Sequence, residues 1–335
     1  YLMLITAVRN ERDLKAIVVM FLAAMGLYMT HSFREYLCGR HVFRMGISRM
    51  IGVDATYNDP NTFSATILYA LPIVFPVWRL ARQPWHRRLL LGYVTLSVVC
   101  ILLTGSRSAF VGLSALALVV TFYSKHRWNV AAALVIAAPL VWLSLSEPLQ
   151  RRFLTLIDPS YGPANAQLSA EGRAQGWHDG VRLWQENPLL GVGPGCFPQA
   201  RGIPLESHHL YGQILGEVGT LGAITFAAVV LAFFANYRQL GRLCRADPSL
   251  RDTFPAGLIR AITLTVVLLL LMGFVGHKLS RYTWIWFGAF QVIALRCVIR
   301  QTQSSALATA DTPLEIAPAG RLQPAFSAAS QGHPW

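Results

Sequence analysis

The chain has 335 residues, of which 54% are hydrophobic and 13% are charged, about half the charged share of an ordinary soluble domain. A soluble protein of this length needs more polar side chains to cover its outside, so the composition argues against a water-soluble enzyme and favours lipid around much of the surface. The formal net charge is +13, but Lys and Arg punctuate apolar runs, which makes nucleic acid a poor choice of partner.

The chain begins with an apolar run, Tyr1 to Val8, that is too short to cross a bilayer. We expect an N-terminally truncated chain in which residues 1–13 are the end of a truncated helix and a cytoplasmic connection. No secretory signal peptide is recognisable. The five cysteines are scattered, without a C-x-x-C pair or a histidine at metal-ligand spacing, so no structural zinc and no essential disulfide are predicted.

Apolar segments of about 20 residues, the length that crosses a bilayer as a helix, follow along the chain. They lack the alternation of barrel strands, so the predicted fold class is an all-α polytopic membrane protein. Five predicted transmembrane helices lie in residues 14–145 and three in residues 208–299. The eight predicted spans are 14–33, 62–80, 88–104, 108–124, 128–145, 210–235, 257–276 and 282–299.

Lys and Arg in the short connections predict the orientation. The connections 79–88, 125–127 and 236–256 are rich in these residues and are assigned to the cytoplasm. The C-terminal residues 300–335 are rich in Ala, Ser, Gln and Pro without periodicity, and we expect a disordered cytoplasmic tail there.

The opposite, periplasmic side holds a large loop, residues 146–207. It contains a helix-like stretch from Gly172 to Glu186 that stops before Pro188, so short helices are expected inside it. Long ordered loops of this kind usually carry function. In the same loop Gly191, Gly193 and Gly195 fit a tight turn, because no βαβ unit surrounds them.

Arg107 stands in the turn Thr104-Gly105-Ser106-Arg107 between two apolar spans. A cation close to lipid is costly unless it faces a partner or a water-filled cavity. The planar guanidinium is well matched to phosphate oxygens, so an anionic, lipid-carried ligand would explain this arginine. Most other basic residues on the outer side also fit solvated surface charges, because long loops are exempt from the positive-inside rule.

Ser207, His208 and His209 lie at the junction of the long loop and the sixth span. Ser207 fits an N-cap, which would place His208 in the first helical turn. The helix dipole and nearby arginines disfavour imidazolium there, leaving a neutral histidine that can act as a base. The alternative interpretation is a pair of interfacial histidines bonded to loop carbonyls.

The same predicted helix carries Gly212, Gly216, Gly219 and Gly222, and the G-x-x-x-G pair at its start is typical of close helix packing. Glu217 would be an intramembrane carboxylate in this span. Such a carboxylate is either a functional group or the partner of a buried arginine or backbone donor.

Four motifs in this order resemble the O-antigen ligase and O-antigen polymerase superfamily of bacterial membrane glycosyltransferases. Residues 59–63 (DPNTF) resemble its D-P-N entry into a helix, for which a simple turn before a helix start is the alternative. Residues 103–107 (LTGSR) resemble its T-x-S-R turn, and residues 173–197 (RAQGWHDGVRLWQENPLLGVGPGCF) its R-x3-W … P-L-x-G-x-G loop. Residues 208–222 (HHLYGQILGEVGTLG) are similar to its H-N-x-Y helix, with His209 in place of the usual Asn.

The resemblance implies an O-antigen ligase-like enzyme of the bacterial inner membrane, without metal or other cofactor. It would transfer a glycan from undecaprenyl diphosphate to an acceptor hydroxyl, such as one of lipid A core, at the periplasmic face. Carried over by position, Arg107 and Arg173 would hold the diphosphate, and His208 would take the proton from the acceptor hydroxyl. The residues expected to support them are His209, Glu217, Asn61 and Tyr211.

Other functions stay open at this stage. An O-antigen or exopolysaccharide polymerase and a protein O-oligosaccharyltransferase would share the donor site and differ in the acceptor. A transporter of an anionic lipid-linked substrate would need broken spans at matching positions of two halves, but Pro72, Pro76 and Pro139 have no counterparts in the last three spans. A purely structural subunit would not need a cation at Arg107.

Overall fold

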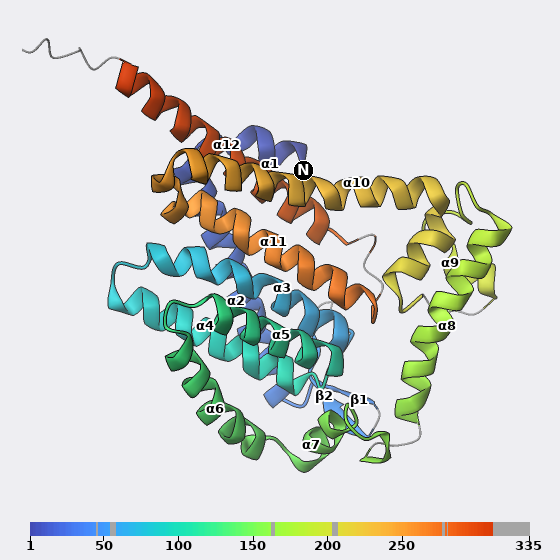
Figure 1. Cartoon of the computed structure of the whole chain (residues 1–335). Coiled ribbons are helices and arrows are strands. Elements are labelled where there is room, and N and C mark those ends of the chain that lie inside the picture. Colours follow the sequence, from blue (N-terminus) through green and yellow to red (C-terminus); the bar gives the residue numbers. More distant parts are fainter. Residues whose placement is uncertain are drawn as a thin grey trace, which may run out of the picture.

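The structure is a computed structural model that describes residues 1–44, 46–53, 58–161, 165–202, 207–276, 279 and 281–310. Within these ranges only the backbone is described for residues 159, 165–171, 173 and 304–310. Every predicted span is a helix (Figure 1), and the helices are α2 (Glu11–Leu37), α3 (Pro60–Leu80), α4 (Pro84–Leu103), α5 (Arg107–Tyr123), α6 (Arg127–Ser144), α10 (Leu210–Ala246), α11 (Phe254–Gly273) and α12 (Thr283–Ala310).

Seven of these helices are long and apolar enough to cross a membrane, and α5 is a shorter apolar helix. This confirms an all-α polytopic membrane protein. The described strands are two short ones, β1 (Val42–Arg44) and β2 (Ile47–Arg49), which pair antiparallel in the outer segment after α2.

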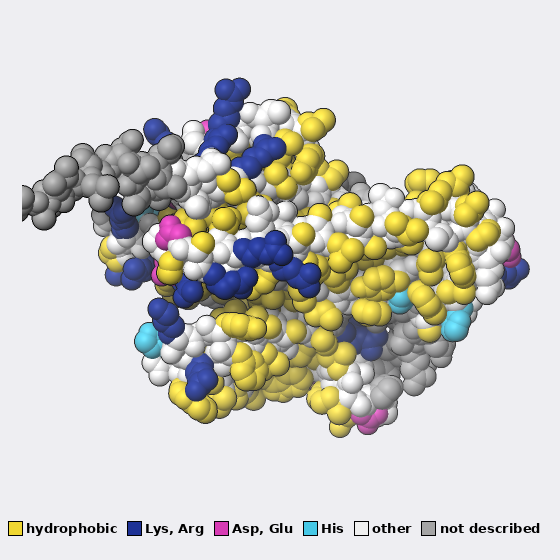
Figure 2. Space-filling model, turned by 45° about the horizontal axis from the view of Figure 1, so that its top comes forward, with side chains coloured by type: hydrophobic (Ala, Val, Ile, Leu, Met, Phe, Trp, Pro, Cys, Tyr) yellow, Lys and Arg dark blue, Asp and Glu magenta, His cyan; other side chains and the backbone are white. Residues whose placement is uncertain are grey.

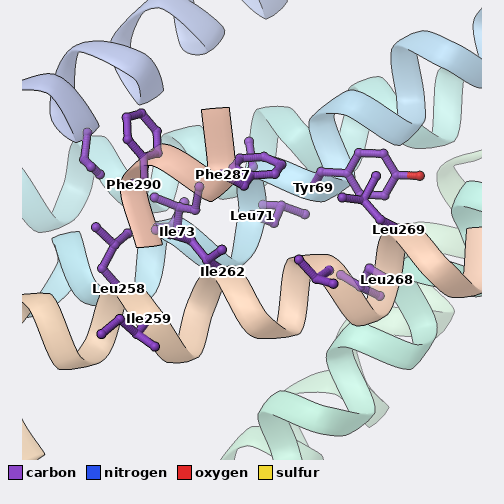
Figure 3. Close-up of a cluster of buried hydrophobic side chains, with 14 of the residues drawn as sticks. Tyr69, Leu71, Ile73, Leu258, Ile259, Ile262, Leu268, Leu269, Phe287 and Phe290 are labelled. Atoms are coloured by element: carbon purple, nitrogen blue, oxygen red, sulfur yellow. The ribbon is translucent and has the colours of Figure 1, made fainter. Parts of the chain in front are cut away.

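The core lies where α3, α11 and α12 meet (Figure 3). Side chains such as Ile73 of α3, Ile262 of α11 and Phe290 of α12 are fully buried there. By contrast, α6 has no buried residue, and hydrophobic side chains cover much of the surface in Figure 2. Because lipid is as apolar as these side chains, tight packing and interhelical hydrogen bonds have to hold such helices together. One such bond runs from Thr265 Oγ1 to the carbonyl of Tyr69 (3.0 Å).

The two ends of the bundle differ. The α3–α4, α5–α6 and α10–α11 connections, predicted to be cytoplasmic, lie together at one end, on the left of Figure 1. The other end carries the β1–β2 hairpin and the predicted periplasmic loop. That loop contains the expected short helices α7 (Glu147–Leu154) and α9 (Phe197–Arg201) and a 3-10 turn (Pro159–Tyr161). It also contains the longer helix α8 (Asn165–Glu186), which begins before the predicted helical stretch from Gly172 to Glu186. We call this the outer end.

Helices are present at both ends of the described chain. The initial apolar run forms α1 (Leu2–Ala7), which packs on α12. At the other end α12 continues to Ala310, past the predicted start of a tail at Arg300, and Gln301 donates to Glu11 of α2 (2.7 Å). Residues 311–335 of the predicted tail lie outside the described residues.

Helix α8 crosses the outer end and packs against the first turns of α10 (Figure 1). Glycines on both helices permit backbone contact. A Cβ atom on Gly180 would lie 2.2 Å from the carbonyl oxygen of Gly212, and one on Gly212 would lie 2.5 Å from that of Gly176. This confirms the close packing that the G-x-x-x-G pair predicts, with the partner helix now identified as α8.

The prediction of one continuous helix over 210–235 is wrong at Gly219. This residue has φ 60° and ψ −161°, and in Figure 1 the first part of α10 turns away from the long second part. Such a backbone conformation is essentially restricted to glycine. A Cβ atom would also lie 2.6 Å from the carbonyl oxygen of Leu189, so two independent constraints require glycine here.

The turn between α8 and α9 satisfies the backbone groups that this break releases. The amide of Val192 donates to the carbonyl of Gly216 (2.9 Å), and the amide of Thr220 donates to the carbonyl of Pro188 (2.9 Å). Trp184 of α8 adds a bond from its indole nitrogen to Thr220 Oγ1 (2.9 Å). The glycine-rich turn is therefore part of the α10 fold, which agrees with its interpretation as a tight loop.

Substituting Gly180 by Ala should destabilise the protein by about 1–3 kcal/mol, because the new methyl group meets a backbone that cannot move independently. Gly172 of the same helix has open space around it, and Gly172→Ala should be neutral or slightly stabilising. Thermal unfolding of both variants in detergent tests this. Equal transition temperatures would contradict the helix contact.

Candidate functional site

Three arginines converge on the turn between α4 and α5 at the outer end. Arg49 donates from Nε to the carbonyl of Thr104 (2.7 Å), and Arg152 donates from Nε to the carbonyl of Gly105 (2.6 Å). Arg107 is the first residue of α5, directly after the turn, and donates from Nη1 to Thr155 Oγ1 (3.1 Å). We call Arg49, Arg107 and Arg152 the arginine cluster.

Local structure explains how the two added arginines reach this turn. Arg49 ends β2, in which Ile47 and Arg49 are buried and share one face. Arg152 lies on the buried face of α7 with Leu149 and Phe153, at the i, i+3, i+4 spacing of a helix face. The ring of Phe153 stacks on Phe110 of α5 with 4.6 Å between centroids, which holds α7 against the turn.

Two arginines of the cluster are buried, whereas Arg107 is partly exposed. The exposed fraction is 1% for Arg49 and 8% for Arg152. Burial first, and then the charge of Arg152, lower the pKa of Arg49 to about 9, while Asp59 opposes the shift. Arg49 is still protonated at neutral pH, so two buried guanidinium groups lie at the same turn, and this group is well matched to phosphate oxygens.

Asn61 belongs to this cluster, because its Oδ1 accepts a hydrogen bond from Arg49 Nη2 (2.9 Å). The start of α3 places it there. Asp59 caps the helix by accepting from the amide of Thr62 (2.8 Å), and Pro60 occupies the first turn, as the sequence predicts.

The start of α10 differs from the prediction in its cap. His209, not Ser207, is the N-cap, with Nδ1 accepting from the amide of Gly212 (3.1 Å). The hydroxyl of Ser207 instead bonds to the carbonyl of Gly176 in α8 (3.3 Å), which explains why it does not cap the helix. His208 therefore precedes the helix instead of lying in its first turn. It is exposed, and its backbone lies against Gly176.

His209 sits among aromatic rings. The distances between its ring centroid and those of Trp177, Tyr211 and Phe274 are 5.3, 5.7 and 5.8 Å. Burial lowers the pKa of His209. Because Nδ1 accepts the capping bond, the neutral ring carries its proton on Nε2.

Of the remaining predicted residues, Tyr211 donates its hydroxyl to the carbonyl of Leu270 (2.9 Å) and so ties α10 to α11. Glu217 is 1% exposed, accepts from Gln213 Nε2 (3.2 Å) and lies two residues before the break at Gly219. Arg173 lies in α8, three positions before Gly176, and its side chain lies outside the described part of the structure.

The arginine cluster and the two histidines lie at the same end of the bundle and are linked through α11. Leu210, which follows the histidines, packs on Gly273 at the end of α11: a Cβ there would lie 2.8 Å from Leu210 Cδ2. The neighbouring Met272 packs on Gly112, just over one turn after Arg107. The helices that carry the two groups are thus fixed relative to each other by direct packing.

The described residues contain no group of three or more His, Cys, Asp or Glu side chains that could hold a metal ion. The cationic groups described at this part of the outer end are the guanidinium groups of Arg49, Arg107 and Arg152. A site with this chemistry suits a phosphate or diphosphate.

The family model described as O-Antigen ligase matches residues 92–227 of this chain. This confirms the resemblance to the O-antigen ligase and polymerase superfamily. The matched region runs from α4 to α10 and includes Arg107, Arg152 and both histidines. It supports a glycosyltransferase-like enzyme of this general type in a multi-pass membrane protein. No curated protein sequence matches the chain.

Sequence reasoning did not single out Arg49 and Arg152, which counted only among the basic residues of the outer side. A signal for Arg152 exists in α7, where it shares the apolar face with Leu149 and Phe153. Arg49 carries a weaker signal, because the strand that holds it is only three residues long.

Replacing His209 by Asn should remove a pH dependence from the start of α10 while keeping a capping oxygen. The lowered pKa of His209 means that the folded state binds fewer protons than the unfolded chain, whose histidine titrates near 6.5. The stabilisation is therefore complete above about pH 6.5 and is lost as the pH falls from there to the folded pKa.

Hydrogen exchange at the amide of Gly212, compared between pH 7.5 and pH 5 after correction for intrinsic rates, measures this effect. We expect protection to fall at pH 5 in the wild-type protein and to stay constant in His209→Asn. Amides in the middle of α11 serve as the internal control. The same loss in both proteins would show that another group controls this helix start.

Proposed function

We propose that this protein is an O-antigen ligase-like glycosyltransferase. It transfers an oligosaccharide or polysaccharide from undecaprenyl diphosphate to an acceptor hydroxyl, that of lipid A core, at the periplasmic face of the bacterial inner membrane. The observation that carries the proposal is the convergence of Arg49, Arg107 and Arg152 on one turn at the outer end, within a chain that matches the O-antigen ligase family.

In the proposed reaction the acceptor oxygen attacks the anomeric carbon of the donor sugar. The bond from that carbon to the phosphate oxygen breaks, and undecaprenyl diphosphate leaves with the electron pair. His208 takes the proton of the acceptor hydroxyl. The guanidinium groups, together with Arg173, stabilise the negative charge that develops on the diphosphate, a task for which many enzymes use a divalent metal. Metal independence is part of the proposal.

His208 suits the role of base by its position. It lies before the first turn of α10, where the helix dipole disfavours a positive charge on a nearby side chain. It is exposed at the outer end, so a hydroxyl can reach it. His209 is less suited, because its Nδ1 is used as the helix cap.

The acceptor separates this proposal from its neighbours. An O-antigen or exopolysaccharide polymerase would use a second lipid-linked glycan, and a protein O-oligosaccharyltransferase would use a polypeptide hydroxyl. A transporter of the lipid-linked substrate would move it without forming a new glycosidic bond. Offering lipid A core, a lipid-linked glycan and a polypeptide separately with one defined lipid-linked donor distinguishes all four functions by product.

The pair Arg151 and Arg152 provides a matched test of the donor site. Arg152 is buried in the arginine cluster, whereas Arg151 is exposed and pairs with Glu147 (2.6 Å). We expect Arg152→Lys to lower kcat/KM about 10- to 100-fold, since a point charge does not reproduce the planar fork. Arg151→Lys should leave the activity within about twofold, because an exposed pair contributes little. Equal activity of both variants would remove Arg152 from the site.

The pair His208 and His178 tests the base. His208→Ala should lower kcat by about 10²–10⁴-fold, the usual contribution of a general base. His178 is an exposed histidine of α8, and its replacement by Ala should leave kcat unchanged. The glycan transferred per minute is the measurement, with membrane insertion checked for both variants. Full activity of His208→Ala would contradict the assignment of the base.

A further inference from the structure

A second group of arginines surrounds a pocket at the end of the bundle opposite to the histidines. The pocket has a volume of about 590 Å³ and lies beside the last turns of α10. Figure 2 shows Lys and Arg side chains gathered toward this end of the molecule. The arginines that line the pocket are Arg238, Arg242 and Arg245 of α10 and Arg260 of α11.

The apolar surface of α10 leads directly to these arginines. Ile224, Leu231, Arg238 and Arg245 follow one another at intervals of seven residues, which places them on one face of the helix. Ile224 and Leu231 are exposed to 61% and 66%, as expected of side chains that contact lipid tails. One face of α10 therefore passes from a lipid-facing stripe to a group of cations.

The cations are not neutralised by acidic side chains of the described residues. None of the ion pairs there includes Arg238, Arg242, Arg245 or Arg260, and the nearby Asp252 is paired with Arg79 (2.9 Å). The positive-inside tendency and the helix dipole both favour basic residues at this place. Neither effect explains why four of them surround the same hollow, where they repel one another.

A glycine lines the pocket between two of the arginines, and a hydrogen bond holds a third arginine in place. Gly241 lies between Arg238 and Arg245 on the same face, and a Cβ atom there would meet nothing within 4 Å. Arg260 donates from Nη1 to the carbonyl of Arg251 (2.7 Å), which fixes its guanidinium at the border of the pocket.

We propose that this pocket binds the phosphate of an anionic phospholipid headgroup. The arginines contact the phosphate oxygens, and an acyl chain lies along the stripe of Ile224 and Leu231. A free phosphate ion or a soluble phosphate ester would use the same guanidinium groups, but it would not need the lipid-facing stripe that continues into the pocket. Cardiolipin, which carries two phosphates, is the headgroup best matched to four cations.

The experiment measures cardiolipin binding to the purified protein in nanodiscs that contain phosphatidylcholine and a titrated amount of cardiolipin, with bound lipid counted by native mass spectrometry. Replacing Arg238, Arg242 and Arg245 together by Gln should weaken cardiolipin binding about a hundredfold. Replacing Arg82 and Arg88, exposed arginines of the same end outside the pocket, should change it less than threefold.

A second variant distinguishes the effect of the space in the pocket from the effect of its charge. Gly241→Leu fills the hollow and keeps every arginine, and it should weaken cardiolipin binding about tenfold. Gly92→Leu is the matched control, because Gly92 of α4 also has open space around it. Thermal unfolding checks that all variants are folded.

Cardiolipin binding that survives both Gly241→Leu and the triple substitution would overturn the proposal. Competition is the third arm. Adding 10 mM inorganic phosphate should leave cardiolipin bound. Chloride at the same ionic strength is the control. Displacement by phosphate and not by chloride would overturn the assignment to a lipid in favour of a soluble anion.

Discussion

The contact between the backbones of α8 and the first turns of α10 holds the outer end of this molecule in place. Gly176, Gly180 and Gly212 let the two helices approach without intervening side chains, and Ser207 adds a bond to the carbonyl of Gly176. The loop is held on the helix bundle by direct packing and hydrogen bonds. Through this contact the loop and His208 share one rigid support.

The break at Gly219 belongs to the same support. A continuous helix would carry Glu217 and the histidines along the axis of the long second part of α10. The break instead turns the first part across the outer end, and the turn after α8 bonds to the backbone groups that the break exposes. Backbone polar groups released by a helix break have to be satisfied elsewhere, and here the loop provides their partners.

Hydropathy was sufficient to predict the apolar helices, because this signal is local. The lengths of the apolar runs predict the spans, and Asp59 followed by Pro60 predicts the start of α3. The break at Gly219 could not be predicted in this way, since four glycines of α10 have similar local sequence. Gly219 is distinguished by the tertiary approach of Leu189 and Gly191 from the loop.

The candidate site could likewise be predicted only where the signal is local. Arg107 has a strong local signal, a cation in a short turn between apolar spans. Arg49 reaches the same turn from a hairpin and Arg152 from a separate helix, so their convergence depends on tertiary structure. The cap of α10 follows the same rule: Ser207 and His209 can both cap, and the bond from Ser207 to α8 decides between them.

The net charge of the chain therefore has two physical meanings. At the outer end, two buried arginines donate to the carbonyls of Thr104 and Gly105 at the end of α4, where the helix dipole lowers the cost of their charge. At the opposite end, the arginines of α10 are exposed on one helix face and remain hydrated. A buried, oriented charge can discriminate between a ground state and a transition state, because it cannot relax around either. Hydrated side chains adapt to any phosphate, which suits the retention of a lipid better than catalysis.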